Sequence, residues 1–186
     1  MIDRLIDDIH KALDNKAYLA ALSLALTLPD ICGKAAFPSE GCTKRYIKWY
    51  DEYVGYSEKP PYNEDRLQLP YLSGEVVFQL RCSMLHQGTP NIDPCHIKND
   101  ICKINRFELI IEPQNNFGIY SDCSCLTRTN NINSQQVDVE RIYKVNVRRL
   151  CFILCSCAEG YFKKNKNQFD FFNCTVIDYD AKSNNV

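Results

Sequence analysis

The stretch YLSGEVVFQLRCSMLHQGTPN, residues 71–91, combines a helix-forming apolar pattern with an arginine, a histidine and a glycine–proline break. Its apolar side chains recur at intervals of four residues, within about 120° of one another around a helix: Leu72, Val76, Leu80 and Met84. This spacing predicts a helix over about 71–87 with one face in the core. Gly88 follows the last helical residue, where glycine commonly adopts the left-handed cap.

Arg81 and His86 stand five positions apart in this helix. A regular helix advances about 100° per residue, so the two side chains point about 140° apart and do not share a face. They converge on one substrate only if the helix ends near His86, or if a second copy of the chain supplies its own pair across a two-fold axis. Gly88 favours the first arrangement, and the half-apolar stripe of Phe78 and Leu85 favours the second.

The chemistry of an arginine and a histidine suits RNA cleavage. An imidazole takes or gives a proton near neutral pH, which suits a 2′-hydroxyl nucleophile or a 5′-oxygen leaving group. A guanidinium presents a fork of donors to the charged phosphorane between them, and no metal is needed. The simpler account is a helix-capping histidine beside a surface arginine, since nine arginines and three histidines make such a pair common.

The rest of the chain predicts a mainly α fold. Apolar periodicity indicates helices over about 2–13, 16–28, 43–54 and 138–164, besides the one at 71–87. RFELIIEP (106–113) and FGIYSDCS (117–124) indicate two paired strands, LTRTNNINSQQ (126–136) a polar loop, and FDFFNCTVIDYD (169–180) a third strand. We therefore expect a bundle of about five helices with a small antiparallel sheet, formed by a hairpin before the last helix and a strand after it.

Length and composition favour one soluble domain over 1–186, with its helical part at 1–100 and 138–164 and a β appendage at about 105–122 and 169–179. The 186 residues are 45% hydrophobic and carry a formal net charge of −1, so the overall charge indicates no nucleic acid partner. The start MIDRLIDDIH lacks the basic head of a secretory signal, and the apolar run at 19–28 is short for a membrane span. These features predict a cytoplasmic protein without membrane contact.

Eleven cysteines, an odd number, occur without an export signal and predict reduced thiols. A zinc site is the alternative, with ligands from Cys95, His96 and Cys102, from CSC at 123–125, or from CFILCSC at 151–157. Cys155 and Cys157 point about 200° apart on a helix and do not clasp one ion. The sequence therefore assigns no metal and no cofactor.

The segment YLSGEVVFQLRCSMLHQGTPNID resembles the motif-bearing helix of the HEPN superfamily (higher eukaryotes and prokaryotes nucleotide-binding). That signature is an arginine, a polar residue, a few more positions and a histidine, often followed by glutamine and glycine. Here it takes the form Arg81, Cys82, three residues, His86, Gln87 and Gly88. The helices before it are similar to those of small uncharacterised bacterial proteins of this type, so the resemblance covers about the first hundred residues.

The resemblance implies a homodimer in which two motifs face one cleft, and in many members a metal-independent endoribonuclease of toxin–antitoxin, phage-defence or RNA-processing systems. Arg81 is then expected to stabilise the scissile phosphate and His86 to act as general acid or base. The implied partners are RNA, a second copy and an antitoxin or sensor protein. Cys82 departs from the asparagine, aspartate or histidine frequent in active members, and it is a poor hydrogen-bond donor.

Two other functions stay open at this point. One is a non-catalytic module that binds RNA, a nucleotide or a partner protein with the same bundle. The other is a scaffold whose cysteine-rich hairpin binds metal. On the expected last helix, Arg141, Lys144 and Arg148 fall within about 60° of one another and are candidate contacts to an RNA backbone, although a solvated helix face is the more common reason for such a group.

Overall fold

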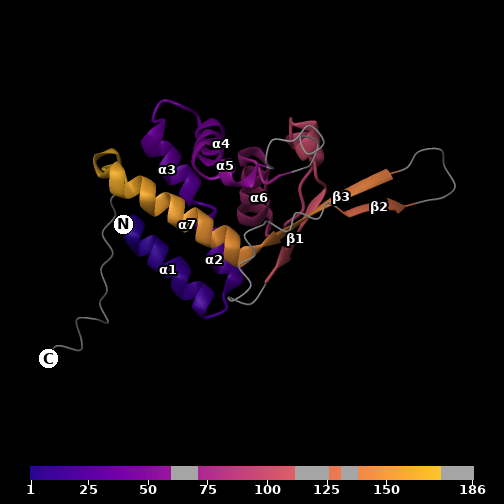
Figure 1. Cartoon of the computed structure of the whole chain (residues 1–186), viewed down its shortest axis with the longest axis horizontal. Coiled ribbons are helices and arrows are strands. Elements are labelled where there is room, and N and C mark those ends of the chain that lie inside the picture. The colour runs from indigo at the N-terminus through magenta and orange to yellow at the C-terminus, as the bar shows by residue number, and fades with distance from the viewer. Residues whose placement is uncertain (60–70, 112–125, 131–137, 173–186) are drawn as a thin grey trace.

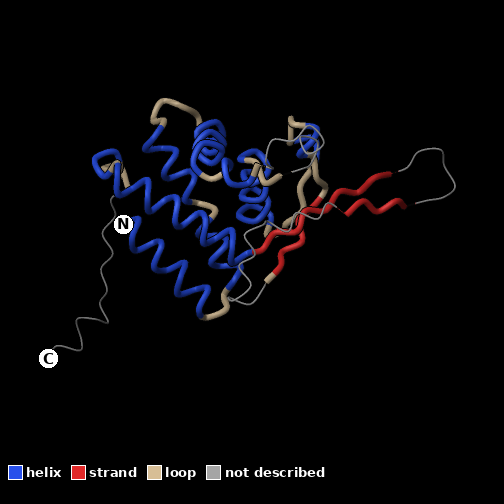
Figure 2. Tube along the Cα trace, in the orientation of Figure 1, coloured by secondary structure: helices blue, strands red, loops and turns tan. Residues whose placement is uncertain are grey.

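The computed structural model describes residues 1–59, 71–111, 126–130 and 138–172. The helices pack together at one end of the molecule, and the paired strands β2 and β3 extend away from them (Figures 1 and 2). The α-helices are α1 (Ile2–Asp14), α2 (Tyr18–Ala25), α3 (Leu28–Ala36), α4 (Cys42–Tyr53), α5 (Gly55–Glu58), α6 (Gly74–Cys82) and α7 (Val147–Lys164). The mainly α fold with a small sheet is confirmed.

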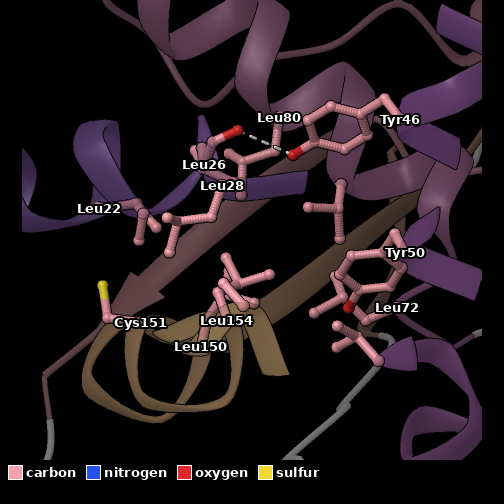
Figure 3. Packing of buried hydrophobic residues seen from close by; sticks show 14 of the residues in the cluster. Leu22, Leu26, Leu28, Tyr46, Tyr50, Leu72, Leu80, Leu150, Cys151 and Leu154 are labelled. Carbon is pink, nitrogen blue, oxygen red and sulfur yellow. Dashed lines mark hydrogen bonds between the residues drawn. The ribbon is translucent and has the colours of Figure 1, made fainter. Parts of the chain in front are cut away.

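Helix α7 lies at the centre of the helical part. It packs against α1, α2 and α3, and its inward face consists of fully or nearly fully buried side chains: Leu150, Cys151, Leu154, Cys155 and Ala158. Leucines of α2 and α3 meet this face, and the rings of Tyr46 and Tyr50 from α4 close the same cluster (Figure 3). The predicted apolar seam of the last helix is thus confirmed from Leu150 to Tyr161.

Helix α2 covers Tyr18–Ala25 of the segment expected as one helix over 16–28, and α3, which begins at Leu28, was not predicted as a helix. Helix α2 ends at Ala25, and Pro29 occupies the first turn of α3, where proline is tolerated because its missing N–H has no helical partner. By length and composition alone, the combined stretch Tyr18–Ala36 is long and apolar enough to cross a bilayer. Half of it is buried within the fold, and a core helix of a soluble protein passes the same test.

The sheet is mixed rather than antiparallel throughout, which corrects the expectation. Its strands are β1 (Arg106–Ile110), β2 (Leu126–Asn130) and β3 (Asp138–Asn146), in the order β1-β3-β2. Strand β1 runs parallel to β3, with Arg106 opposite Ile142, and β2 runs antiparallel to it, with Leu126 opposite Ile142. Strand β1 falls where it was predicted, whereas β2 lies in the segment predicted as a polar loop. The strand expected at 117–124 lies outside the described residues.

The last helix begins nine residues later than predicted. Residues 138–146 form β3, in which Ile142, Tyr143 and Val145 are buried. Asn146 then caps α7, because its side chain accepts a hydrogen bond from the N–H of Arg149 at 3.2 Å. Tyr143 and Val147 continue the four-residue spacing of the helix seam, which is why the helical pattern extended too far back.

Residues 169–172 do not form part of the strand that was predicted after the last helix, so that prediction is wrong for them. A 3₁₀ turn, η5 (Lys166–Gln168), follows α7, and Phe169 then packs in the core against Tyr161 and Phe162. The remainder of the expected strand lies outside the described residues. Helices and sheet share one buried cluster, since Phe107 and Tyr143 belong to the same core as Leu150.

Candidate functional site

Helix α6 carries the arginine–histidine pair and is held closely against α4. Ser73 caps its start and accepts a hydrogen bond from Val76 N–H at 3.4 Å. Gly74 N–H donates to Asp51 Oδ1 at 2.7 Å, and a Cβ at position 74 would lie 2.6 Å from the carbonyl oxygen of Ile47. Only glycine permits this close approach, so Gly74 lets the start of α6 pack directly against the backbone of α4.

The helix changes from α-helical to π-helical geometry after Cys82. Residues Ser83–Gln87 form a π-helical turn, η2, and Gly88 ends it in the left-handed conformation, with φ 65° and ψ 20°. Hydrogen bonds from Gly88 N–H to Met84 O at 3.2 Å and from Thr89 N–H to Ser83 O at 3.4 Å close the end. The predicted glycine cap is confirmed, whereas the π turn was not predicted.

The π turn brings the candidate catalytic residues together. Its hydrogen bonds join residues five apart, so the chain completes one turn between Arg81 and His86. As a result Arg81 Nη1 lies 3.4 Å from His86 Nε2. The two residues therefore share one site within a single chain, which a regular helix would not allow.

Arg81 lies between this exposed turn and the buried edge of α4. Burial raises the pKa of Tyr46 well above its usual value, and the positive charge of Arg81 opposes the rise. Burial also raises the pKa of Cys42, again opposed by the charges of Arg45 and Arg81. Tyr46 itself is fixed by a hydrogen bond to Leu26 O at 3.1 Å (Figure 3), so the inner wall beside Arg81 is rigid.

The guanidinium of Arg81 retains unused donors. Its Nε is buried and has no hydrogen-bond partner within the described part of the chain, and no carboxylate there forms an ion pair with it. By contrast, the neighbouring Arg45 is held by Asp30, with Nε at 2.9 Å and Nη2 at 2.8 Å from the same carboxylate oxygen. Within the described residues Arg81 is thus not held by a carboxylate, in contrast to Arg45.

The outer part of the site is exposed. His86 and Gln87 are exposed, and 38% of the Leu85 surface is accessible. Cys82, the residue that follows the arginine in the motif, is half-buried and is a free thiol. The imidazole is therefore accessible to a large substrate such as a polynucleotide.

The predicted basic face of the last helix does not exist. Arg141 and Lys144 belong to strand β3, and Arg148 belongs to α7. Arg148 is engaged with Tyr18, whose hydroxyl lies 2.6 Å from its Nη2 and whose ring centre lies 4.8 Å from its guanidinium carbon. These three residues do not form one helical stripe, so the sequence-based argument for an RNA-backbone contact no longer holds.

Sequence reasoning missed the residues that surround Arg81. Asp30, Cys42 and Arg45 come from α3 and α4, far from α6 in the sequence, and they meet at its edge. No pattern of neighbouring residues in the sequence predicts this grouping.

Of the cysteines of α7, Cys151 and Cys155 are buried and Cys157 is half-buried. Burial raises the pKa of Cys151 and of Cys155 to about 12, and it raises the pKa of Cys32 further. All eight cysteines in the described residues are free. The CSC segment at 123–125 lies outside them.

Comparison with known proteins gave no match to any protein-family model, any curated protein or any solved structure.

Proposed function

We propose that this chain is a metal-independent endoribonuclease of the HEPN type, in which Arg81 and His86 act on RNA in a cleft shared by two copies. The observation that carries the proposal is the 3.4 Å contact between Arg81 Nη1 and His86 Nε2. It joins a phosphate-binding fork to a proton-transfer group on an exposed turn. π turns are rare in helices, and where they occur they are frequently found at functional sites.

The reaction follows from the two groups. A base removes the proton of the 2′-hydroxyl, whose oxygen attacks the adjacent phosphorus. The bond from phosphorus to the 5′-oxygen breaks, and an acid protonates that oxygen. The products are a 2′,3′-cyclic phosphate and a 5′-hydroxyl, and no metal or water takes part in this step.

Arg81 is the group that stabilises the transition state in this proposal. In the free protein its Nη1 lies 3.4 Å from His86 Nε2, so the guanidinium stands beside the proton-transfer group. When a phosphate enters, the guanidinium donates to the non-bridging oxygens, where charge increases during the attack.

A second copy supplies the second proton-transfer group. One imidazole cannot accept the 2′-hydroxyl proton and donate to the 5′-oxygen at the same moment, whereas His86 of the partner subunit would complete the pair. The accessible Leu85 stands beside His86 in the same turn and gives a partner copy an apolar surface on which to pack.

The decisive experiment is RNA cleavage by purified protein in EDTA, with single-stranded and structured RNA. We expect cyclic-phosphate products from the unaltered chain, and a loss of about 100-fold or more in rate for Arg81→Ala and for His86→Ala. The matched controls are Arg4→Ala and His10→Ala, which change exposed residues of the same types on α1. Cutting that survives both motif substitutions would contradict the proposal.

A binding module without catalysis would give a different result. The chain would then bind RNA or a nucleotide and release no product, and Arg81→Ala alone would weaken the binding. That outcome would keep Arg81 as a phosphate contact and reduce His86 to a helix-capping residue.

A further inference from the structure

The turn after α6 gathers three metal-binding side chains that the proposed nuclease does not use. Asp93, Cys95 and His96 each offer one ligand atom, and these three atoms lie within 4.8 Å of one another. All three side chains are exposed. Cys102, which the sequence had suggested as a partner, is fully buried and is not part of this group.

We propose that Asp93, Cys95 and His96 form a zinc-binding site that leaves a fourth position for water. Zinc is bound by cysteine sulfur, histidine nitrogen and carboxylate oxygen with bonds of about 2.0–2.3 Å, so ligand atoms of a tetrahedral site lie about 3.3–3.8 Å apart. The observed atoms need to approach by about 1.5 Å at most to reach that spacing. Rotation of exposed side chains suffices for this approach.

The backbone that carries the ligands is already fixed. Asp93 caps the 3₁₀ turn η3 (Pro94–His96) and accepts a hydrogen bond from Cys95 N–H at 2.9 Å. The buried side chains of Ile92 and Ile97 anchor the turn on both sides. A metal therefore meets ligands whose main chain loses little freedom on binding, which favours affinity.

The turn is also tied to α6. Gln79 Nε2 donates to His96 O at 3.4 Å, and Asn99 N–H donates to Glu75 Oε2 at 3.3 Å. A bound ion would hold the 92–97 turn rigid against this face of the helix. Because Arg81 and His86 contribute no ligand, this site and the proposed nuclease can fail independently.

The ligand set favours zinc over the hard cations. A thiolate and an imidazole suit zinc and other late divalent metals, whereas magnesium and calcium prefer oxygen ligands alone. On binding, the Cys95 thiol loses its proton to solvent and the imidazole contributes a nitrogen lone pair, so one proton is released and nothing is oxidised or reduced.

The test is a zinc titration of EDTA-treated, reduced full-length chain by calorimetry. Other cysteines can bind zinc weakly, so the quantity measured is the difference between proteins. We expect one fewer zinc ion per chain, or at least about 10-fold weaker binding, for Cys95→Ser and for His96→Gln, since even outer-shell losses around zinc cost about 10- to 100-fold. Cys42→Ser, which removes another exposed thiol, is the matched control and is expected to bind like the unaltered chain.

Cobalt(II) gives a second readout of the same site. Substitution of Co²⁺ is expected to produce the charge-transfer absorption of a thiolate ligand, which Cys95→Ser abolishes and Cys42→Ser retains. The assignment is overturned if Asp93→Asn, Cys95→Ser and His96→Gln combined bind as much zinc as the unaltered chain, or if the unaltered chain binds none. Since all three positions are exposed, circular dichroism is expected to show the same fold in every variant.

Discussion

Arg81 Nη1 lies 3.4 Å from His86 Nε2 because the chain between them makes a π turn in place of an α turn. The relationship between the two residues therefore depends on one irregularity of the backbone, which Gly88 ends in the left-handed conformation. Five residues in a regular helix would have separated the same side chains by about 140°.

Gly88→Ala is expected to destabilise the protein by about 1–2 kcal/mol, since alanine pays this amount in the left-handed region. No atom would meet the new Cβ within 4 Å, so the cost comes from φ alone. Gly160→Ala is the control, because Gly160 lies in α7 with equally open surroundings. Gly160→Ala is expected to stabilise the protein by about 0.5–1 kcal/mol. Urea denaturation of both variants measures the difference, and an equal effect at the two positions would disprove the role of φ.

Arg81→Lys is expected to lower RNA cleavage by about 100-fold or more, although the charge is kept. Lysine is a point charge without the planar fork, so it cannot approach a phosphate and an imidazole in the arginine's geometry. Single-turnover rates in EDTA measure the effect. Near-normal rates for Arg81→Lys would show that charge alone matters at this position.

Co-refolding the unaltered chain with an excess of His86→Ala is expected to lower the cleavage rate per unaltered chain. If two copies share one cleft, a mixed dimer holds one His86 imidazole, whereas the proposed reaction needs one as base and one as acid. The control is the same amount of unaltered chain refolded alone. A rate per unaltered chain that does not fall would indicate that each chain works by itself.

Glu58→Ala is expected to destabilise the fold by about 3–5 kcal/mol, the cost of leaving a buried charge unpaired. The Glu58 carboxylate, 1% exposed, accepts two hydrogen bonds from Arg149, at 2.7 and 3.3 Å. Glu159→Ala breaks an exposed pair with Lys163 and is expected to cost under about 1 kcal/mol. Thermal and urea unfolding compare the two, and similar losses would mean that Glu58 contributes no more than a surface charge.

Asp51→Asn is expected to stabilise the fold more at pH 7 than at pH 4. Burial raises the pKa of Asp51, which outweighs the opposing hydrogen bond from Gly74 N–H. The folded state therefore holds the proton more tightly than the unfolded state, and this residue's contribution to stability falls as pH rises from its ordinary value through its raised one. Asparagine keeps the acceptor oxygen and removes the charge. Urea denaturation at the two pH values tests this, and a pH-independent difference between the proteins would refute it.

The local features of the site were predictable and its surroundings were not. The apolar spacing of α6 and the glycine after it predicted the helix and its cap correctly, because both depend on neighbouring residues. The π turn has no pattern of its own in SMLHQ, so the closeness of Arg81 and His86 could not be predicted. The grouping of Asp30, Cys42 and Arg45 near Arg81 arises only when α3 and α4 pack beside α6.

The sheet was likewise predictable only in part from the sequence. Strand β1 was predicted from its alternation, yet its parallel partner β3 begins more than thirty residues later along the chain. Tyr143 of β3 and Val147 of α7 lie four residues apart, as in the seam of the helix, so the pattern alone favoured a helix across both. Residues 138–146 form a strand because they pair with β1 and because Asn146 caps the helix that follows.

By itself the sequence determined a mainly helical chain, the seam of α7, the end of α6 at Gly88 and the identity of the arginine–histidine pair, because periodicity and capping act between near neighbours. Only the tertiary structure decided the mixed sheet, the start of α7, the closure of Arg81 on His86 and the turn that gathers Asp93, Cys95 and His96. These depend on hydrogen bonds and packing between segments distant in the chain, and on backbone irregularities that packing selects.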